Sequence, residues 1–149
     1  MTLYNHFQSK QDLVVAFLAR REELWTLEWL FAEIRQRAVD PRERLLAIFD
    51  LFDEWFHSPR FEGCSFINVL LEYQPQDPLH KAAAAHLANI RVFLRELAQE
   101  TGAIDANVLA DAWHMLMKGS IVAAREGNHL AASEAKRAAK MVLDNWPRT

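Results

Sequence analysis

The sequence is poor in the residues that interrupt helices and in the residues that cross-link small folds. Its 149 residues include four glycines, five prolines and one cysteine, Cys64. A single cysteine leaves no partner for an internal disulfide, so a disulfide-stabilised secreted scaffold is not expected. The scarcity of glycine and proline, beside abundant alanine, leucine, glutamate and arginine, predicts an all-α protein with one body.

Long apolar runs and a basic charge excess are also missing. No stretch has the length of a membrane span, and no secretory signal opens the chain. We therefore expect a cytoplasmic protein with no membrane partner. The formal net charge is −3, which argues against a chain devoted mainly to nucleic-acid contacts. An acidic body joined to a small basic head would still fit this charge.

Signatures of catalysis and of metal binding are lacking as well. None of the six histidines lies three or four residues from another, and no histidine or cysteine pair has zinc-finger spacing. The chain contains no phosphate-binding glycine loop, no G-x-S-x-G and no H-E-x-x-H. We expect no metal, no cofactor and no enzymatic activity, with a helical enzyme kept as an alternative.

Helix start and stop signals, in contrast, are plentiful. Ser9 with Asp12 forms a capping-box pattern, and the pairs Asp40-Pro41 and Asp77-Pro78 place a capping side chain before a proline suited to the first helical turn. Gly102 and Gly127 are suited to helix ends. The expected helices cover residues 10–38, 40–58, 65–73, 77–101, 107–126 and 133–146.

One expected helix is apolar on nearly every side. Between Val108 and Ala124 most residues are apolar or small, and few carry a charge. Such a helix is expected to be covered on several sides. In a protein of this size, a second copy of the chain could supply one of those sides.

The opening residues carry a specific motif. Thr2 to Leu13 read T-L-Y-N-H-F-Q-S-K-Q-D-L. This stretch closely resembles the end of the DNA-binding head in the TetR (tetracycline-repressor) family of transcriptional regulators, where T-[LI]-Y-x-H-F-x-S-K-x-x-L closes the recognition helix and begins the next one. The resemblance implies a TetR-like helical ligand-binding and dimerisation body over residues 9–149. Residues 1–8 would be a remnant of the helix-turn-helix recognition helix.

The same resemblance implies which residues touch DNA. Thr2, Tyr4 and His6 would lie on the DNA-facing side, and Lys10 would meet a phosphate at the start of the next helix. In the family two helices and the start of the recognition helix precede this motif, whereas here only Met1 does. Because the recognition helix needs its bracing helix, we expect impaired operator binding by these 149 residues.

Members of the family bind small molecules inside the body, which implies a pocket for a small hydrophobic ligand here. Such pockets are mostly apolar with a few placed polar groups. The alternative is that the aromatic residues are ordinary core and that the polar ones are exposed or internally satisfied. The candidate walls are Trp55, Phe56, Phe66, Trp113 and Met117, and the candidate polar contacts are Asn68, Glu72, His86 and His114.

Cys64 precedes an expected helix start, where the helix dipole can lower the pKa of a thiol. A redox sensor is one interpretation of this placement. A buried, inert cysteine is the other.

The last two helices are the candidate dimer interface. Paired with a second copy they would form a four-helix bundle around a two-fold axis. The alternative is that their small-residue faces pack on the body of one chain. The candidate interface residues are Gly119, Ser120, Ala123, Ala135, Ala138, Ala139, Val142 and Trp146.

Taken together, the resemblance implies a homodimeric, ligand-responsive transcriptional repressor whose ligand changes the fit of two heads to operator DNA. The rival hypothesis is a dimeric small-molecule-binding module that does not bind DNA.

Overall fold

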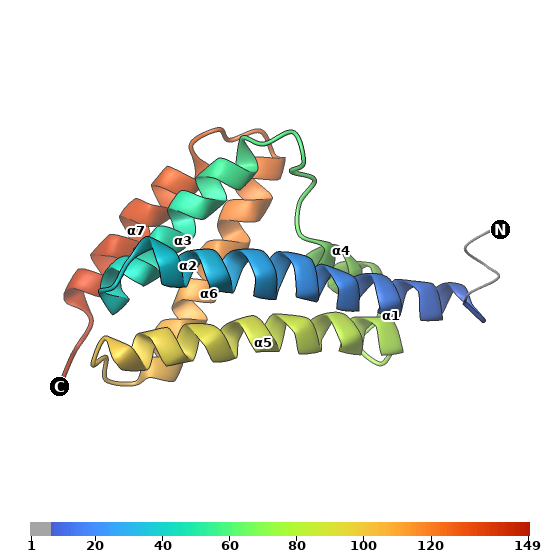
Figure 1. The fold of residues 1–149 in the computed structure, drawn as a ribbon, viewed down its shortest axis with the longest axis horizontal. Coiled ribbons are helices and arrows are strands. Elements are labelled where there is room, and N and C mark those ends of the chain that lie inside the picture. The colour runs from blue at the N-terminus through green and yellow to red at the C-terminus, as the bar shows by residue number, and fades with distance from the viewer. Residues whose placement is uncertain (1–6) are drawn as a thin grey trace.

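The computed structural model describes residues 7–149, which form an all-helical body (Figure 1). No strand occurs in this part of the chain, where one isolated bridge joins Ala103 to Arg148. Nor is any helix in residues 7–149 long and apolar enough to cross a membrane. The elements in chain order are α1 (Lys10–Arg21), the π-helical segment η2 (Glu22–Phe31), α2 (Ala32–Arg37), α3 (Pro41–Phe56), α4 (Ser65–Glu72), α5 (Pro78–Glu100), α6 (Ala106–Arg125) and α7 (Ala131–Asn145).

Local capping fixes three of the six helix starts that the sequence predicts, those of α1, α3 and α5. The Ser9 hydroxyl accepts a hydrogen bond from the Asp12 amide, and the Asp40 carboxylate accepts from the amides of Arg42 and Glu43. These bonds satisfy amide groups that have no partner within the helix. The last helix begins two residues earlier than expected, at Ala131 rather than at about residue 133.

α1, η2 and α2 run on as one continuous helix, called here the long helix (Lys10–Arg37), because the residues at both junctions keep α-helical dihedral angles. The sequence predicts an ordinary α-helix here. Its row of buried and half-buried residues that faces the body is spaced by four residues throughout. In an α-helix, four residues rotate by about 40° more than one full turn. A row of residues spaced by four would therefore wind gradually around the helix and away from the body. The wider turns of η2 absorb this rotation. The row consists of the buried residues Leu18, Thr26, Leu30 and Ile34 and of the half-buried Glu22.

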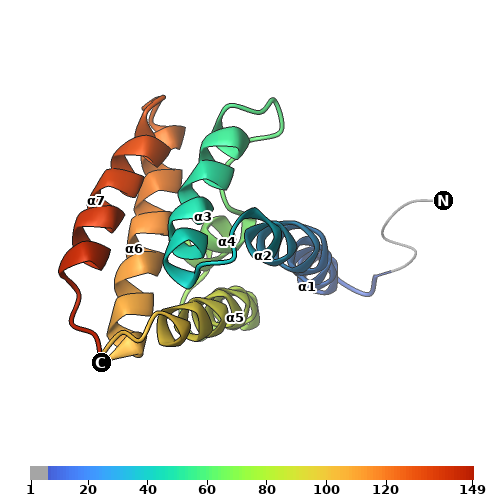
Figure 2. The same cartoon turned by 60° about the vertical axis from the view of Figure 1, so that its left-hand side comes forward.

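The helices form two groups that meet at the core. The long helix and α5 lie side by side, with the short α4 beside the N-terminal half of the long helix (Figure 1). α3, α6 and α7 cross this pair steeply and pack next to one another (Figure 2). A single cluster of buried apolar side chains joins the two groups.

Candidate functional site

Five elements meet in the interior beneath the long helix. Trp25 comes from η2, Phe52 from α3, Ile67 from α4, and both α5 and α6 add further side chains. The cavity that they enclose has a volume of only about 10 Å³, enough for one water at most. Its wall is apolar apart from a few groups, and a ligand could enter only if these helices moved. The wall is completed by Cys64, Leu87, Ile90, His114, Met117, Lys118 and Ile121.

His114 is the buried polar group in this wall. Its side chain is 2% exposed, and its Nδ1 atom has no hydrogen-bond partner in residues 7–149. Burial, with smaller contributions from the charges of Lys118 and Arg91, lowers the pKa of His114 to about 3. The imidazole is therefore neutral at neutral pH and can offer one donor and one acceptor. An unpartnered buried polar atom costs about 1–3 kcal/mol, which marks this position as one to explain.

Two more unpartnered atoms lie on η2. Trp25 Nε1 and Thr26 Oγ1 are buried and have no hydrogen-bond partner among the described residues. A buried indole N–H normally finds an acceptor, and a helical threonine normally bonds back to the preceding turn. The interior beneath the long helix thus combines irregular helix geometry with unused hydrogen-bonding capacity.

A polar contact ties α5 to the long helix near this interior. His86 Nδ1 lies 2.8 Å from Glu22 Oε2, at ion-pair distance but without hydrogen-bond geometry. Glu22 Oε1 accepts a hydrogen bond from Asn89 at 2.6 Å. The His86 ring also stacks on Phe66, with centroids 5.1 Å apart. These contacts fix the distance between α5 and the long helix at its α1–η2 junction.

The structure brings some of the predicted ligand-binding residues together. His114 and Met117 both lie in the wall of the interior cavity. Phe66 and Trp55 border a neighbouring void of similar size, which shares Trp25 and Cys64 with that cavity. His86 reaches this region through its stacking on Phe66.

The other four predicted residues lie elsewhere. Trp113 is fully buried between α3 and α6, where its Nε1 donates to the Leu45 carbonyl at 3.1 Å, as in ordinary core. Phe56 packs on Phe52, Trp55 and Phe61 near the end of α3. Asn68 and Glu72 are exposed because they lie on the outer face of α4.

The sequence reasoning missed Trp25 and Lys118 as site residues, although Trp25 belongs to the apolar pattern of its helix. A further difference concerns Cys64, whose burial raises the pKa of the thiol. The activation that its place before α4 suggested is therefore absent, and Cys64 serves as a wall residue. No group of three or more side chains suited to hold a metal ion occurs in residues 7–149.

A larger hollow lies on the other side of Trp25, at the surface. It is a groove of about 660 Å³ between the long helix and the end of α3 with its following loop. Trp25, Trp29 and Trp55 form a cluster at this groove, with ring centroids 5.2–6.2 Å apart. Trp25 thus borders both the groove and the interior. The remaining lining residues are Arg21, Leu24, Glu54, Ser58, Pro59 and Arg60.

The predicted dimer residues divide into three groups: buried, exposed and half-buried. Ser120 and Ala139 are already buried within the chain, and the Ser120 hydroxyl donates to the Met117 carbonyl, so neither can form the outer contact that was expected. Gly119 is exposed on α6. Trp146 is half-buried, and its Nε1 donates to the Ile104 carbonyl. The others are half-buried as well: Ala123, Ala135, Ala138 and Val142.

The outer face of α6 carries an apolar stripe instead. Val108, Met115 and Val122 are exposed and lie seven residues apart, with Ala112 and Gly119 between them. This spacing of four and three residues is that of a helix-pairing seam. Met141, on α7, is also exposed.

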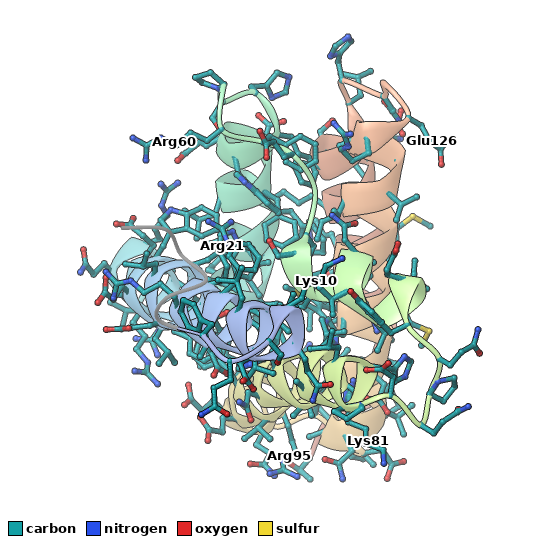
Figure 3. The ribbon with its side chains drawn as sticks, turned by 90° about the vertical axis from the view of Figure 1, so that its right-hand side faces the viewer. Lys10, Arg21, Arg60, Lys81, Arg95 and Glu126 are labelled. Atoms are coloured by element: carbon teal, nitrogen blue, oxygen red, sulfur yellow. The ribbon has the colours of Figure 1, made fainter. Side chains whose placement is uncertain are left out.

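Of the four predicted DNA contacts, Lys10 is exposed at the start of α1, directly after the capping residue Ser9 (Figure 3). Thr2, Tyr4 and His6 lie outside the described residues.

Comparison with known proteins gives no match to a protein-family model and none to a curated protein by sequence. Solved structures do match. A TetR-family transcriptional regulator from Streptomyces coelicolor superposes with a TM-score of 0.85 at 26% identity, over 96% of this chain and 76% of that one. A TetR transcriptional regulator from Chloroflexus aurantiacus gives a TM-score of 0.81 over 99% and 79% of the two chains, and at 23% identity it is similar in fold alone.

Proposed function

We infer that this chain, which is a transcriptional regulator of the TetR type, represses its target genes until a small ligand binds beneath the long helix. The observation that carries the inference is the position of Trp25. It belongs to the helix that begins at Lys10 and also to the wall of the interior cavity. A ligand that displaces Trp25 therefore acts on the element that leads to the proposed DNA-contacting residues.

The ligand would stabilise a second arrangement of the body. A cavity of about 10 Å³ is far smaller than a ligand pocket, which typically has a volume of about 300–1,000 Å³. Binding therefore requires the long helix to move away from α6. The unpartnered atoms of His114 and Trp25 offer hydrogen bonds that only this expanded arrangement would use. The shift can be no larger than the difference in ligand affinity between the two arrangements.

DNA contacts are proposed for the chain before and at the start of the long helix. Residues 1–8 would form the end of the DNA-binding head, with Thr2, Tyr4 and His6 facing the duplex. The ammonium of Lys10 and the free amides of the first turn of α1 would together attract a phosphate.

A homodimer is proposed through α6 and α7. The exposed seam of Val108, Met115 and Val122 supports this arrangement, because a run of large apolar side chains at heptad spacing is typical of a helix–helix interface. A two-fold dimer would place two heads at a fixed separation, as an operator with two half-sites requires.

The test is selection of genomic DNA fragments by the intact gene product, followed by sequencing of the bound fragments. We expect enrichment of one or a few inverted repeats, with affinity that falls as salt rises. The variant Lys10→Gln should reduce the salt dependence by about one ion, whereas the matched variant Lys81→Gln, on α5, should not. A stable dimer that enriches no fragment at any salt concentration would instead support the DNA-free module.

A further inference from the structure

We propose that the surface groove beside the long helix binds an aromatic carboxylate. The groove is a second hollow, distinct from the interior cavity, and it already has the volume of a ligand pocket, about 660 Å³. The proposal goes beyond the proposed function, because it adds a second ligand site and names its ligand class, and it rests on that function for its regulatory consequence.

The walls of the groove select a flat apolar body. Trp25 and Trp29 lie one turn apart on η2, and Trp55 faces them from α3 at centroid distances of 5.2 Å and 6.2 Å. Indole faces favour offset or edge-to-face packing with another aromatic ring. Leu24 on the same helix is exposed and adds to the apolar rim.

The charges of the groove select an anion. Arg21 and Arg60 come from α1 and from the loop after α3, and neither forms an ion pair within residues 7–149. Glu54 is the acidic residue in the lining, and both of its oxygens accept hydrogen bonds from Arg37 at 2.7 Å and 2.8 Å. Two guanidinium groups are therefore available to a carboxylate, which such groups bind with matched geometry.

One side chain, that of Trp25, separates the groove from the interior and borders both. Trp25 borders the groove, the small void beside Cys64 and the interior cavity. A ligand that packs on the groove side of Trp25 bears on the same indole whose Nε1 is unpartnered inside. The groove thus provides a way to act on the long helix from the surface.

The experiment is calorimetric titration of the intact protein with 1-naphthoate and with 1-naphthamide, its neutral counterpart of the same shape. We expect the carboxylate to bind about tenfold or more tightly than the amide, since hydrogen bonds to a charged group contribute the difference. The double variant Arg21→Gln/Arg60→Gln should remove this preference and leave the affinity for the amide within about twofold. Trp29→Leu should weaken both compounds, because it removes a wall of the groove.

The matched control removes two positive charges at another surface. Lys81 and Arg95 lie on α5, at the lower edge of the molecule in Figure 3, away from Arg21 and Arg60. Lys81→Gln/Arg95→Gln should leave both affinities unchanged. Equal binding of acid and amide, no binding of 1-naphthoate, or retention of the preference in Arg21→Gln/Arg60→Gln would overturn the proposal.

These outcomes are separate from those that test repression. Binding of 1-naphthoate at the groove by a protein that selects no DNA would sink the proposed function and leave the groove assignment standing. Operator binding by a protein that ignores 1-naphthoate would do the reverse.

Discussion

Trp113 and His114 are neighbours on α6, and both are buried, but they face different surroundings. Trp113 points to the corner formed by α3, α6 and α7, where its indole N–H is bound to the Leu45 carbonyl. His114 points to the corner beneath the long helix, where its Nδ1 atom has no partner among the described residues. Burial is the same at both positions, so hydrogen-bond satisfaction is what separates ordinary core from a candidate site.

The two corners differ in more than one residue. The α3–α6–α7 corner is regular α-helix, and ion pairs from Lys136 to Asp50 and from Arg42 to Asp144, each at 2.8 Å, join α7 to α3. The corner beneath the long helix contains the π-helical turns, the small voids and the unpartnered atoms of Trp25 and Thr26. We infer that the α3–α6–α7 corner supplies most of the stability of the fold and that the corner beneath the long helix can change its conformation.

The largest expected effect is on the stability of the regular corner. Trp113→Ala should lower the free energy of unfolding by about 3–5 kcal/mol, because it empties a fully enclosed site and removes a satisfied hydrogen bond. Urea denaturation measures this loss. Trp25→Ala, at a half-buried residue that borders the interior cavity, should cost clearly less. An equal cost for the two variants would contradict the distinction between the two corners.

The outer face of α6 provides the next comparison. Met115→Lys should weaken the proposed dimer by about 100-fold, since a lysine ammonium would be buried there without a partner. Leu71→Lys, at an even more exposed apolar residue on α4, is the matched control and should leave association unchanged. Sedimentation equilibrium measures both variants. An unaltered dimer in Met115→Lys would place the interface elsewhere.

The pH dependence of stability tests whether His114 is buried and unpartnered in solution. The unfolded chain takes up a proton on this imidazole below its ordinary pKa of 6.5, whereas the folded protein does so only near pH 3. Between these values the unfolded state binds more protons, so falling pH destabilises the fold by about 1.4 kcal/mol per pH unit. From pH 8 to pH 5 this amounts to about 2 kcal/mol.

His114→Leu should remove this part of the acid sensitivity. The variant should also be at least as stable as the parent at pH 8, because it deletes an unpartnered buried atom. Thermal or urea denaturation at both pH values measures the difference. Parallel pH profiles for parent and variant would show that His114 is exposed or partnered in solution.

The smallest effect is expected at the rim of the groove. Glu54→Gln should cost less than about 1 kcal/mol, because Glu54 is 60% exposed and its pair with Arg37 is screened by solvent. The hydrogen bonds from Arg37 hold the pKa of the Glu54 carboxyl below its usual value, so this small contribution is present at neutral pH and is lost as pH falls through that lowered pKa. A cost of several kcal/mol would show that the rim is rigid.

The fold could be predicted from the sequence to a large extent, because its helix boundaries are set by neighbouring residues. Asp40 and Asp77 accept hydrogen bonds from the amides of the turns that follow them. Gly102 and Gly127 close α5 and α6 with positive φ angles of 77° and 104°, which glycine adopts without strain. Each of these signals acts within a few residues, so no knowledge of packing is needed.

The candidate site could be predicted only in part. His114 and Met117, which the family resemblance made candidates for the pocket, both border the interior cavity. Asn68 and Glu72 were candidates on the same ground, yet they are exposed. Nothing local distinguishes the two cases, because the buried side of a short helix depends on where α5 packs.

What the sequence by itself determined is therefore the set of helices, most of their ends, and the motif from Thr2 to Leu13 that resembles the TetR family. Only the tertiary structure decided that the long helix adopts π-helical turns. These turns keep buried residues such as Thr26 and Leu30 on the side that packs against the body. It also decided that Trp113 is core while His114 is unpartnered, and that three tryptophans from two helices share one groove. Hydrogen bonds and cavities between distant segments arise only when those segments are brought together.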